Sequence, residues 1–109
     1  MATVEERKRQ LEARIEEINI RLHEIEAELV SHNSRDWEDR ATQREPDEVL
    51  EDEGRAGNTE IVAIRAALDR IEQGTYGECV ICGEQIEEAR LDLIPHTPFC
   101  ARDAHRIAR

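Results

Sequence analysis

Three cysteines and one aspartate have the spacing of a zinc site. Cys79 and Cys82 form a C-x-x-C pair, and after seventeen further residues Cys100 and Asp103 form a second pair with the same internal spacing. Two ligands three residues apart can occupy one edge of a tetrahedron, and the second pair closes the opposite edge once the chain has looped back. Gly83 allows the tight turn in which backbone N–H groups point at the sulfur atoms. The pattern predicts a structural zinc knuckle.

The fourth ligand of this predicted site is open to alternatives. Asp103 is in register, because it lies three residues after Cys100 and on the same face of a helix. His105 and His96 are rivals, since imidazole is the better zinc ligand, although His105 is awkward to bring to the metal from the helix that carries Cys100. Two further hypotheses concern the thiols themselves. They could pack without metal as small hydrophobic side chains, or they could act as a redox sensor, because a weak fourth ligand leaves three thiolates easier to oxidise.

A second group of chemically capable residues lies at Asp36, Glu38 and Asp39, next to the single tryptophan, Trp37. Paired carboxylates can bind Mg²⁺ or act as acid and base. A chain tip that is exposed on all sides offers no pocket to shift a carboxyl pKa, so we do not expect an enzyme. The residue types alone favour a solvated loop with Trp37 packed over the end of the helices, and the alternative is a tip delivered into a partner's cavity.

Composition narrows the class of protein. The 109 residues carry a formal charge of −11, with 38% charged and 3% aromatic side chains. Such a chain repels the phosphates of nucleic acids and has too few large apolar side chains for a thick core. No apolar run approaches the roughly 20 residues of a membrane span, and the N-terminus has no apolar stretch of the secretory type. We therefore expect a cytoplasmic protein, in which an odd number of cysteines favours metal over disulfides.

Two helices with matching heptad patterns must position these groups. After a first gap of seven residues in the first helix, seam residues at alternating steps of three and four predict the narrow seam of a coiled coil. The matched periods allow the two helices to pair as an antiparallel hairpin over residues 1–75, with an acidic tip at about 32–45. The second seam contains two glycines. Near them we expect the two helices either to be held together least firmly or to approach each other most closely. The seams are Val4, Leu11, Ile15, Ile18, Leu22, Ile25 and Leu29, then Leu50, Gly54, Gly57, Ile61, Ile64, Leu68 and Ile71.

Local signals predict where the elements begin and end. Pro46 suits the first position of the second helix, preceded by a short helical turn over 37–43, with Asp36 as its N-cap. Gly74 predicts the end of that helix near residue 73. The zinc-finger unit is expected over 76–109, with a short strand or turn within 86–94 and a closing helix over 100–109. The predicted fold class is mainly α.

Several runs of this sequence resemble the DksA/TraR family, the zinc-finger regulators of bacterial RNA polymerase. The resemblance covers the chain from the first seam residue to its end. It is closest in Leu-Asp-Arg-Ile-Glu-Gln-Gly-Thr-Tyr-Gly-Glu-Cys at 68–79, in Cys-Gly-Glu-Gln-Ile at 82–86 and in Arg90-Leu91. The tip Asp-Trp-Glu-Asp-Arg-Ala at 36–41 fits the D-x-x-D-x-A motif of the family.

The resemblance implies a regulator that binds RNA polymerase and is not an enzyme. Members of the family insert the coiled coil through the secondary channel of the polymerase and modulate initiation without sequence-specific DNA contact. By position, Asp36 and Asp39 would be the acids near the active centre, and Ala41 a small residue needed for fit. The zinc finger would hold the base of the arm on the rim of the polymerase.

The sequence departs from the family pattern in three respects. Asp103 replaces the fourth zinc cysteine. The chain begins almost at the coiled coil, and its length is close to that of the short TraR-like members. The positions that align with the basic residues used by some members to bind the alarmone ppGpp are Ala63, Ile94 and Ala104, so we expect weak or absent ppGpp cooperation. The alternatives to polymerase regulation are the thiol or zinc redox sensor on the same fold, and a coiled-coil scaffold.

Overall fold

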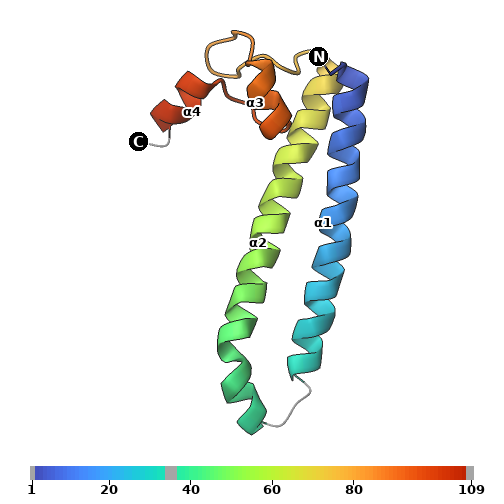
Figure 1. The fold of residues 1–109 in the computed structure, drawn as a ribbon, viewed down its shortest axis with the longest axis vertical. Coiled ribbons are helices and arrows are strands. Elements are labelled where there is room, and N and C mark those ends of the chain that lie inside the picture. The colour runs from blue at the N-terminus through green and yellow to red at the C-terminus, as the bar shows by residue number, and fades with distance from the viewer. Residues whose placement is uncertain (1, 34–36, 108–109) are drawn as a thin grey trace. The chain divides into compact units, whose positions relative to one another are not determined.

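The computed structural model describes residues 2–33 and 37–107, with side chains described outside 32–45. Within this part of the chain the structure has four helices, which confirms the mainly α prediction (Figure 1). Two are long, and the two short ones belong to the cysteine-containing segment. An isolated antiparallel bridge joins Glu78 to Gln85. The helices are α1 (Val4–Asn33), α2 (Trp37–Gln73), α3 (Glu88–Leu93) and α4 (Ala101–Ile107).

The chain divides into two compact units. The first contains residues 1–14 and 62–109, and the second contains residues 15–61. Each unit includes a stretch of α1 and a stretch of α2. Among the residues that the structure describes, none of the helices combines the length and the apolar character that a membrane span requires.

In the unit 15–61, part of the predicted seam is buried, and Ile15, Leu22 and Leu29 are half-buried. Its buried apolar side chains are Ile18, Ile25, Leu50 and Ile61. The two seam glycines behave differently: a Cβ on Gly57 would lie 3.1 Å from Ile18 Cγ2 and 3.2 Å from Leu22 Cδ2, whereas a Cβ on Gly54 would meet nothing within 4 Å. The two helices therefore approach closely at Gly57 and leave room at Gly54.

An ion pair crosses between the helices of the same unit. Arg21 on α1 donates two hydrogen bonds to the Glu53 carboxylate on α2, with Nε–Oε2 and Nη2–Oε1 distances of 2.6 and 3.0 Å. Both side chains are partly exposed, so solvent screens much of their attraction. The hydrogen bond from Arg21 is the main reason that the pKa of Glu53 lies below its usual value.

In the other unit, the first turn of α1 has a defined start. The Thr3 hydroxyl accepts a hydrogen bond from the Glu6 backbone N–H at 3.1 Å, which is the geometry of an N-cap. Val4, expected to open the seam, is 48% exposed, while Arg7 is 3% exposed. The buried row on α1 thus starts with a charged side chain and continues with Leu11, which is 1% exposed.

The start of α2 differs from the sequence prediction. The helix begins at Trp37 and runs through Pro46, which lies inside it, so the prediction of a helix start at Pro46 was wrong. A proline inside a helix removes one hydrogen bond and crowds the preceding turn, but it does not prevent a helix from continuing on both sides. The residue proposed as N-cap, Asp36, lies outside the described residues.

The end of α2 follows the prediction closely. Gly74 has φ 77°, its N–H bonds the Ile71 carbonyl at 3.2 Å, and the Thr75 N–H bonds the Arg70 carbonyl at 2.9 Å. These two bonds form a Schellman motif, which satisfies carbonyls that the helix leaves unpaired. The chain then turns away from α2 and into the cysteine-containing segment.

The segment 86–94 was expected as a strand or turn, and this was wrong. It contains α3, whose sequence Glu-Ala-Arg-Leu-Asp-Leu is rich in strong helix formers. The helix buries Leu91 against the cysteine-containing core. Burial of one apolar side chain per turn is sufficient reason for a short helix here.

Candidate metal centre

The first cysteine pair lies on a tight turn whose backbone is well satisfied. The Cys79 N–H bonds the Glu84 carbonyl at 2.8 Å, and the Gly83 N–H bonds the Cys79 carbonyl at 2.9 Å. Gly83 has φ 78°, a conformation that a residue with a Cβ adopts at a cost. The expectation that Gly83 permits this turn is confirmed.

The second pair is brought to the first by the segment that precedes α4. The Val80 N–H, inside the first pair, bonds the Pro98 carbonyl at 3.0 Å. Cys100 directly precedes α4, and its carbonyl accepts the hydrogen bond of the Ala104 N–H at 2.9 Å. Asp103 lies in the first turn of α4, so the same helix start presents both members of the pair. The predicted closing helix is confirmed over Ala101–Ile107.

The four side chains converge on one point. Their ligand atoms all lie within 4.8 Å of one another. Asp103 Oδ2 lies 3.1 Å from Cys79 Sγ and 3.3 Å from Cys100 Sγ, and the sulfur atoms of Cys82 and Cys100 are 3.9 Å apart. In a tetrahedral site with bonds of about 2.3 Å to sulfur and about 2.0 Å to oxygen, two sulfurs lie about 3.8 Å apart and a sulfur and an oxygen about 3.5 Å apart. The residues present therefore fit a zinc ion.

Four protein ligands, three of them buried, make this a closed centre. Cys79, Cys100 and Asp103 are buried, while Cys82 is exposed. The two buried thiols pack with Ile86 and Leu91 in one apolar core. A fully protein-ligated ion beside such a core stabilises the fold, and a catalytic zinc would instead keep one position for water.

Hydrogen bonds give the thiols different acidities. Burial raises the pKa of Cys79, but backbone N–H groups of Cys100, Cys82 and Ile81 outweigh it and leave that pKa lowered. A hydrogen bond from the Glu84 N–H lowers the pKa of Cys82. Interaction with Asp103, partial desolvation of the sulfur and the neighbouring thiols of Cys79 and Cys100 outweigh it and raise that pKa to about 11. These directions describe the metal-free side chains, and a divalent cation would favour the deprotonated form of every ligand.

Hydrogen bonds also shift the pKa of the Asp103 carboxyl group. Hydrogen bonds from Cys79 and then Cys82 lower the pKa of Asp103. The side chain is 2% exposed, and a carboxylate so placed requires partners that favour its charged form. The thiols supply hydrogen bonds without metal, and a bound cation would supply its charge.

The alternatives for the fourth ligand are placed differently. Asp103 belongs to the group of residues able to share one metal ion, and among the described side chains this group includes neither His96 nor His105. His105 is exposed, and the His96 carbonyl accepts a hydrogen bond from Arg70 at 3.3 Å. The geometry favours Asp103 as the fourth ligand.

The predicted tip residues are only partly within the described structure. Asp36 lies outside the described residues. Asp39 and Ala41 lie in the first turns of α2, and their side chains are not described. Their role therefore stays a prediction.

Sequence reasoning missed a buried arginine next to this centre. Arg7 donates hydrogen bonds to Glu88 Oε2 at 2.9 Å, to Asp92 Oδ1 at 2.7 Å and to the Leu91 carbonyl at 3.3 Å. Its position four residues before Leu11, on the same helix face, was the available signal. An arginine at such a position is more often solvated, so the signal was weak.

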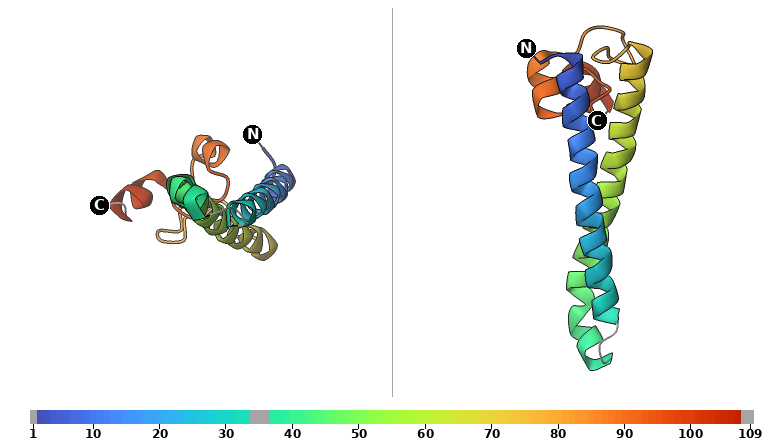
Figure 2. Two further views of the ribbon diagram at one scale, coloured as in Figure 1. Left: turned by 90° about the horizontal axis from the view of Figure 1, so that it is seen from below. Right: turned by 90° about the vertical axis from the view of Figure 1, so that its right-hand side faces the viewer.

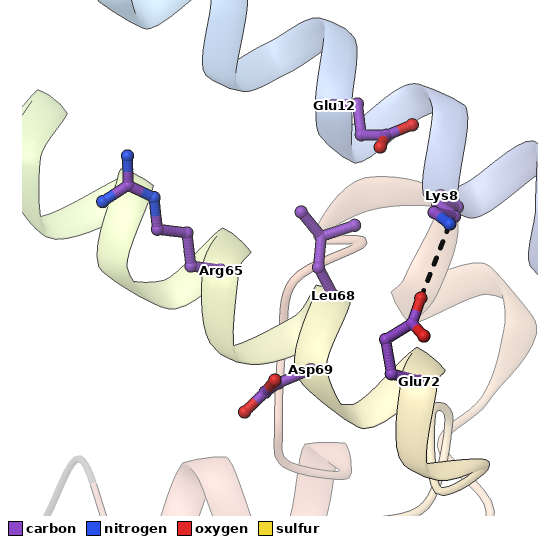
Figure 3. A pocket seen from close by; sticks show the side chains of 6 residues that line it. All are labelled: Lys8, Glu12, Arg65, Leu68, Asp69 and Glu72. Atoms are coloured by element: carbon purple, nitrogen blue, oxygen red, sulfur yellow. Dashed lines mark ion pairs between the residues drawn. The ribbon is translucent and has the colours of Figure 1, made fainter.

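A groove between α1 and α2 lies in the same unit and carries charges of both signs. Figure 3 shows Leu68 extending from α2 into it, and Lys8 reaching from α1 toward Glu72 at 3.5 Å. Its other lining residues are Glu12, Arg65 and Asp69. The groove is open to solvent, so its ion pair is screened.

Comparison with known proteins identifies the family. A model described as DnaK suppressor protein-like, N-terminal domain, matches residues 7–71, and a model described as prokaryotic dksA/traR C4-type zinc finger matches residues 74–102. The chain belongs to the DksA/TraR family. The zinc-finger match ends one residue before Asp103, the position at which this chain has a carboxylate in place of a fourth cysteine.

Solved structures support the same fold. Transcription factor DksA2 from Pseudomonas aeruginosa superposes with a TM-score of 0.86 at 24% identity, over 96% of this chain and 82% of that one. The solution structure of a DnaK suppressor protein from Agrobacterium tumefaciens C58 gives a TM-score of 0.66 at 45% identity, over 97% and 95% of the two chains. The predicted DksA-type coiled-coil fold is confirmed.

A curated relative is an uncharacterized protein from Aquifex aeolicus (strain VF5). It is 43% identical over 82 residues, which cover 72% of this chain and 54% of that protein. The chain thus spans about half the length of this relative. The zinc-finger match and the cluster of three thiols and one carboxylate together point to a structural zinc ion in this chain.

Proposed function

We propose that this protein regulates transcription by binding RNA polymerase directly. Its coiled coil would enter through the secondary channel and modulate initiation, in the cytoplasm and without sequence-specific DNA contact. The observation that carries the proposal is the family match, which extends over both the helical residues 7–71 and the zinc finger 74–102. The charge of −11 agrees with a factor that avoids the DNA backbone.

The proposal divides the chain into two functional parts. Residues 1–75 form the arm, and its tip at about 32–45 presents Asp36 and Asp39 to the active centre of the polymerase, with Ala41 as a small residue that fits there. The arm would supply charge and no reaction of its own, so the protein is a regulator and not an enzyme. Residues 76–109 would hold the base of the arm on the polymerase.

Zinc would have a structural role in this scheme. Cys79, Cys82 and Cys100 would hold it, with Asp103 as the fourth ligand. When bound, the ion cross-links the turn after α2 to the start of α4 and so stabilises a segment too small to fold on a hydrophobic core alone. The chain's own contribution is the preformed cradle, in which backbone N–H groups already favour the thiolate of Cys79.

The experiment measures the lifetime of promoter complexes formed by purified polymerase. We expect the wild-type protein to change this lifetime and the double variant Asp36→Asn/Asp39→Asn to lose the effect. Glu38→Gln is the matched control, because it removes an acid from the same tip at a position that the motif leaves free. An equal effect of wild type and the double variant would refute the proposed role of the tip.

Cooperation with ppGpp is expected to be weak or absent. Ala63, Ile94 and Ala104 carry no charge with which to bind a polyphosphate. Initiation at a ribosomal promoter, measured with and without the nucleotide, tests this expectation. Strong synergy between factor and nucleotide would contradict it.

A redox-sensing role is a second candidate. The exposed thiol of Cys82 has its sulfur 3.9 Å from that of Cys100, so peroxide could oxidise the pair to a disulfide while being reduced to water. This role predicts that peroxide releases zinc and alters the effect on polymerase together. Zinc release without a change in that effect would exclude it.

A further inference from the structure

Arg7 is a buried charge at the start of α1. Its side chain is 4% exposed, while those of its acidic partners Glu88 and Asp92 are 41% and 65% exposed. Burial alone would lower the pKa of the guanidinium, but hydrogen bonds from it to Asp92 and Glu88 leave that pKa raised. Figure 2 (right) shows α3 beside the first turns of α1, where these contacts are made. The guanidinium is thus largely removed from water and joined to α3 by three hydrogen bonds.

The three acceptors of Arg7 span the whole of α3. Glu88 is the first residue of that helix, and Asp92 lies four residues later on the same face. The third acceptor is the Leu91 carbonyl, at 3.3 Å. A helical partner for this carbonyl would be the N–H four residues later, but that residue is Pro95, which has none. Arg7 therefore satisfies a carbonyl that α3 cannot satisfy itself.

An adjacent face of α3 packs in the cysteine-containing core. The Leu91 side chain packs in the apolar core that also contains Cys79, Cys100 and Ile86. The residue whose carbonyl binds Arg7 thus places its side chain in the same apolar core as two of the proposed zinc ligands. Because the chain enters the cysteine-containing segment from α2, nothing covalent joins α1 directly to α3, and their register depends on such contacts.

We infer that Arg7 is a positioning residue that couples the metal centre to the first turns of α1. Cys79 and Cys100 would be fixed by a bound metal, and the core that they share with Leu91 would then fix α3. In that position α3 presents its two carboxylates and one carbonyl to Arg7. The start of α1 is thereby held against the zinc finger. The inference also states how the zinc finger would fix the base of the arm on the polymerase, and that part rests on the proposed function.

Coupling of this kind is reciprocal. If metal binding strengthens the contact between α1 and α3, then loss of that contact must weaken metal binding by the same factor. The carboxylates are partly solvated and lose little when Arg7 is removed, so the main loss is the charged hydrogen bonding and the unsatisfied Leu91 carbonyl. We expect a factor of about ten, which corresponds to about 1.4 kcal/mol.

The first test needs no polymerase. Arg7→Met keeps an unbranched apolar side chain and removes the guanidinium with its hydrogen bonds. Lys8→Met is the matched control, because Lys8 is 43% exposed and its ion pair with Glu72 crosses the open groove. Amide hydrogen exchange in residues 4–10, and zinc affinity measured against a competing chelator, are compared. In Arg7→Met we expect protection from exchange and zinc affinity each to fall about tenfold. In Lys8→Met we expect both to stay at the wild-type level. Removal of zinc should bring the exchange of the wild type to the level of the variant.

Unchanged exchange or unchanged zinc affinity in Arg7→Met would overturn the inference, as would an equal loss in Lys8→Met. Arg7→Lys guards against a variant that does not fold. It keeps the charge but can reach fewer of the three acceptors, so the coupling predicts an intermediate loss in both measurements. A loss as large as that of Arg7→Met, or none, would contradict the role of the guanidinium geometry.

The second test separates positioning from simple destabilisation. A variant that is only less stable has a lower concentration of folded protein, so adding more of it restores the full effect on promoter complexes. Loss of positioning lowers the maximum effect itself, at concentrations that saturate binding. We expect the lower maximum for Arg7→Met and an unchanged one for Lys8→Met, and a maximum restored by excess Arg7→Met would overturn the inference. If the wild type has no effect on polymerase, the proposed function fails, while exchange and zinc affinity still decide the coupling.

Discussion

Replacement of Asp103 is the sharpest probe of the metal centre. Asp103→Ala removes the only oxygen ligand of the proposed set and leaves three thiolates. The carboxylate oxygen already lies 3.1 and 3.3 Å from two of the sulfurs, near the separation of about 3.5 Å that a tetrahedral site requires. Little rearrangement is therefore needed to bind, and nearly all of the contribution of the ligand is lost when it is removed. Loss of a residue that only supports a ligand costs about 10- to 100-fold in metal affinity, so we expect about 100-fold for Asp103→Ala.

The assay is competition for zinc with a chromophoric chelator, together with elemental analysis of the purified proteins. Asp103→Cys should bind zinc at least as tightly as the wild type, since it creates a four-thiolate set. His105→Ala and His96→Ala are the matched controls, and both should retain wild-type affinity. Equal zinc content and equal affinity in wild type and Asp103→Ala, with a loss in either histidine variant, would refute the assignment of Asp103.

Two further predictions concern the arm. Gly54→Ala should stabilise the protein by about 1 kcal/mol through helix propensity, whereas Gly57→Ala should be neutral or destabilising, because its Cβ would press on Ile18 and overpacking costs about 1–3 kcal/mol; equal stabilisation in chemical denaturation would contradict the close approach at Gly57. The pKa of Glu53 is lowered in the folded protein, so its carboxylate contributes stability at pH values above the unfolded pKa. This contribution is lost as the pH falls through the folded pKa. Glu53→Gln should therefore be less stable than the wild type near neutral pH and equally stable in strong acid. Urea denaturation at both pH values measures this, and a difference that persists in acid would argue against the ion pair with Arg21.

The features that sequence predicted correctly are those with local causes. Heptad spacing indicates a helix with one apolar face because periodicity follows from helix geometry alone, and Ile18, Ile25 and Ile61 are buried as expected. Gly74 ends α2 because only the residue itself and its nearest neighbours decide an αL cap. The two pairs of metal ligands could be predicted for the same reason, because the members of each pair are only three residues apart.

The wrong predictions came from local signals that compete. Pro46 is a good first residue of a helix and also tolerable inside one, and the residues before it, which include Glu38 and Ala41, are helix formers. The segment 86–94 was ambiguous because its few apolar residues, interrupted by charged ones, are too short a pattern to separate a strand from a helix. Its helix buries Leu91 in a core made with cysteines more than eight residues away on either side. Local helix and strand propensities carry no information about such distant contacts.

The sequence alone determined that the chain is helical, that it pairs a long apolar seam with a zinc-finger spacing, and that its net charge is unsuited to DNA. Each of these depends on spacing or composition, which the order of residues states directly. Only the tertiary structure decided that Asp103 rather than a histidine faces the thiols, and that Arg7 is buried against a helix more than eighty residues later. Those outcomes depend on distances across the fold, because hydrogen bonds and ligand geometries are realised over a few ångströms in space, whatever the separation along the chain.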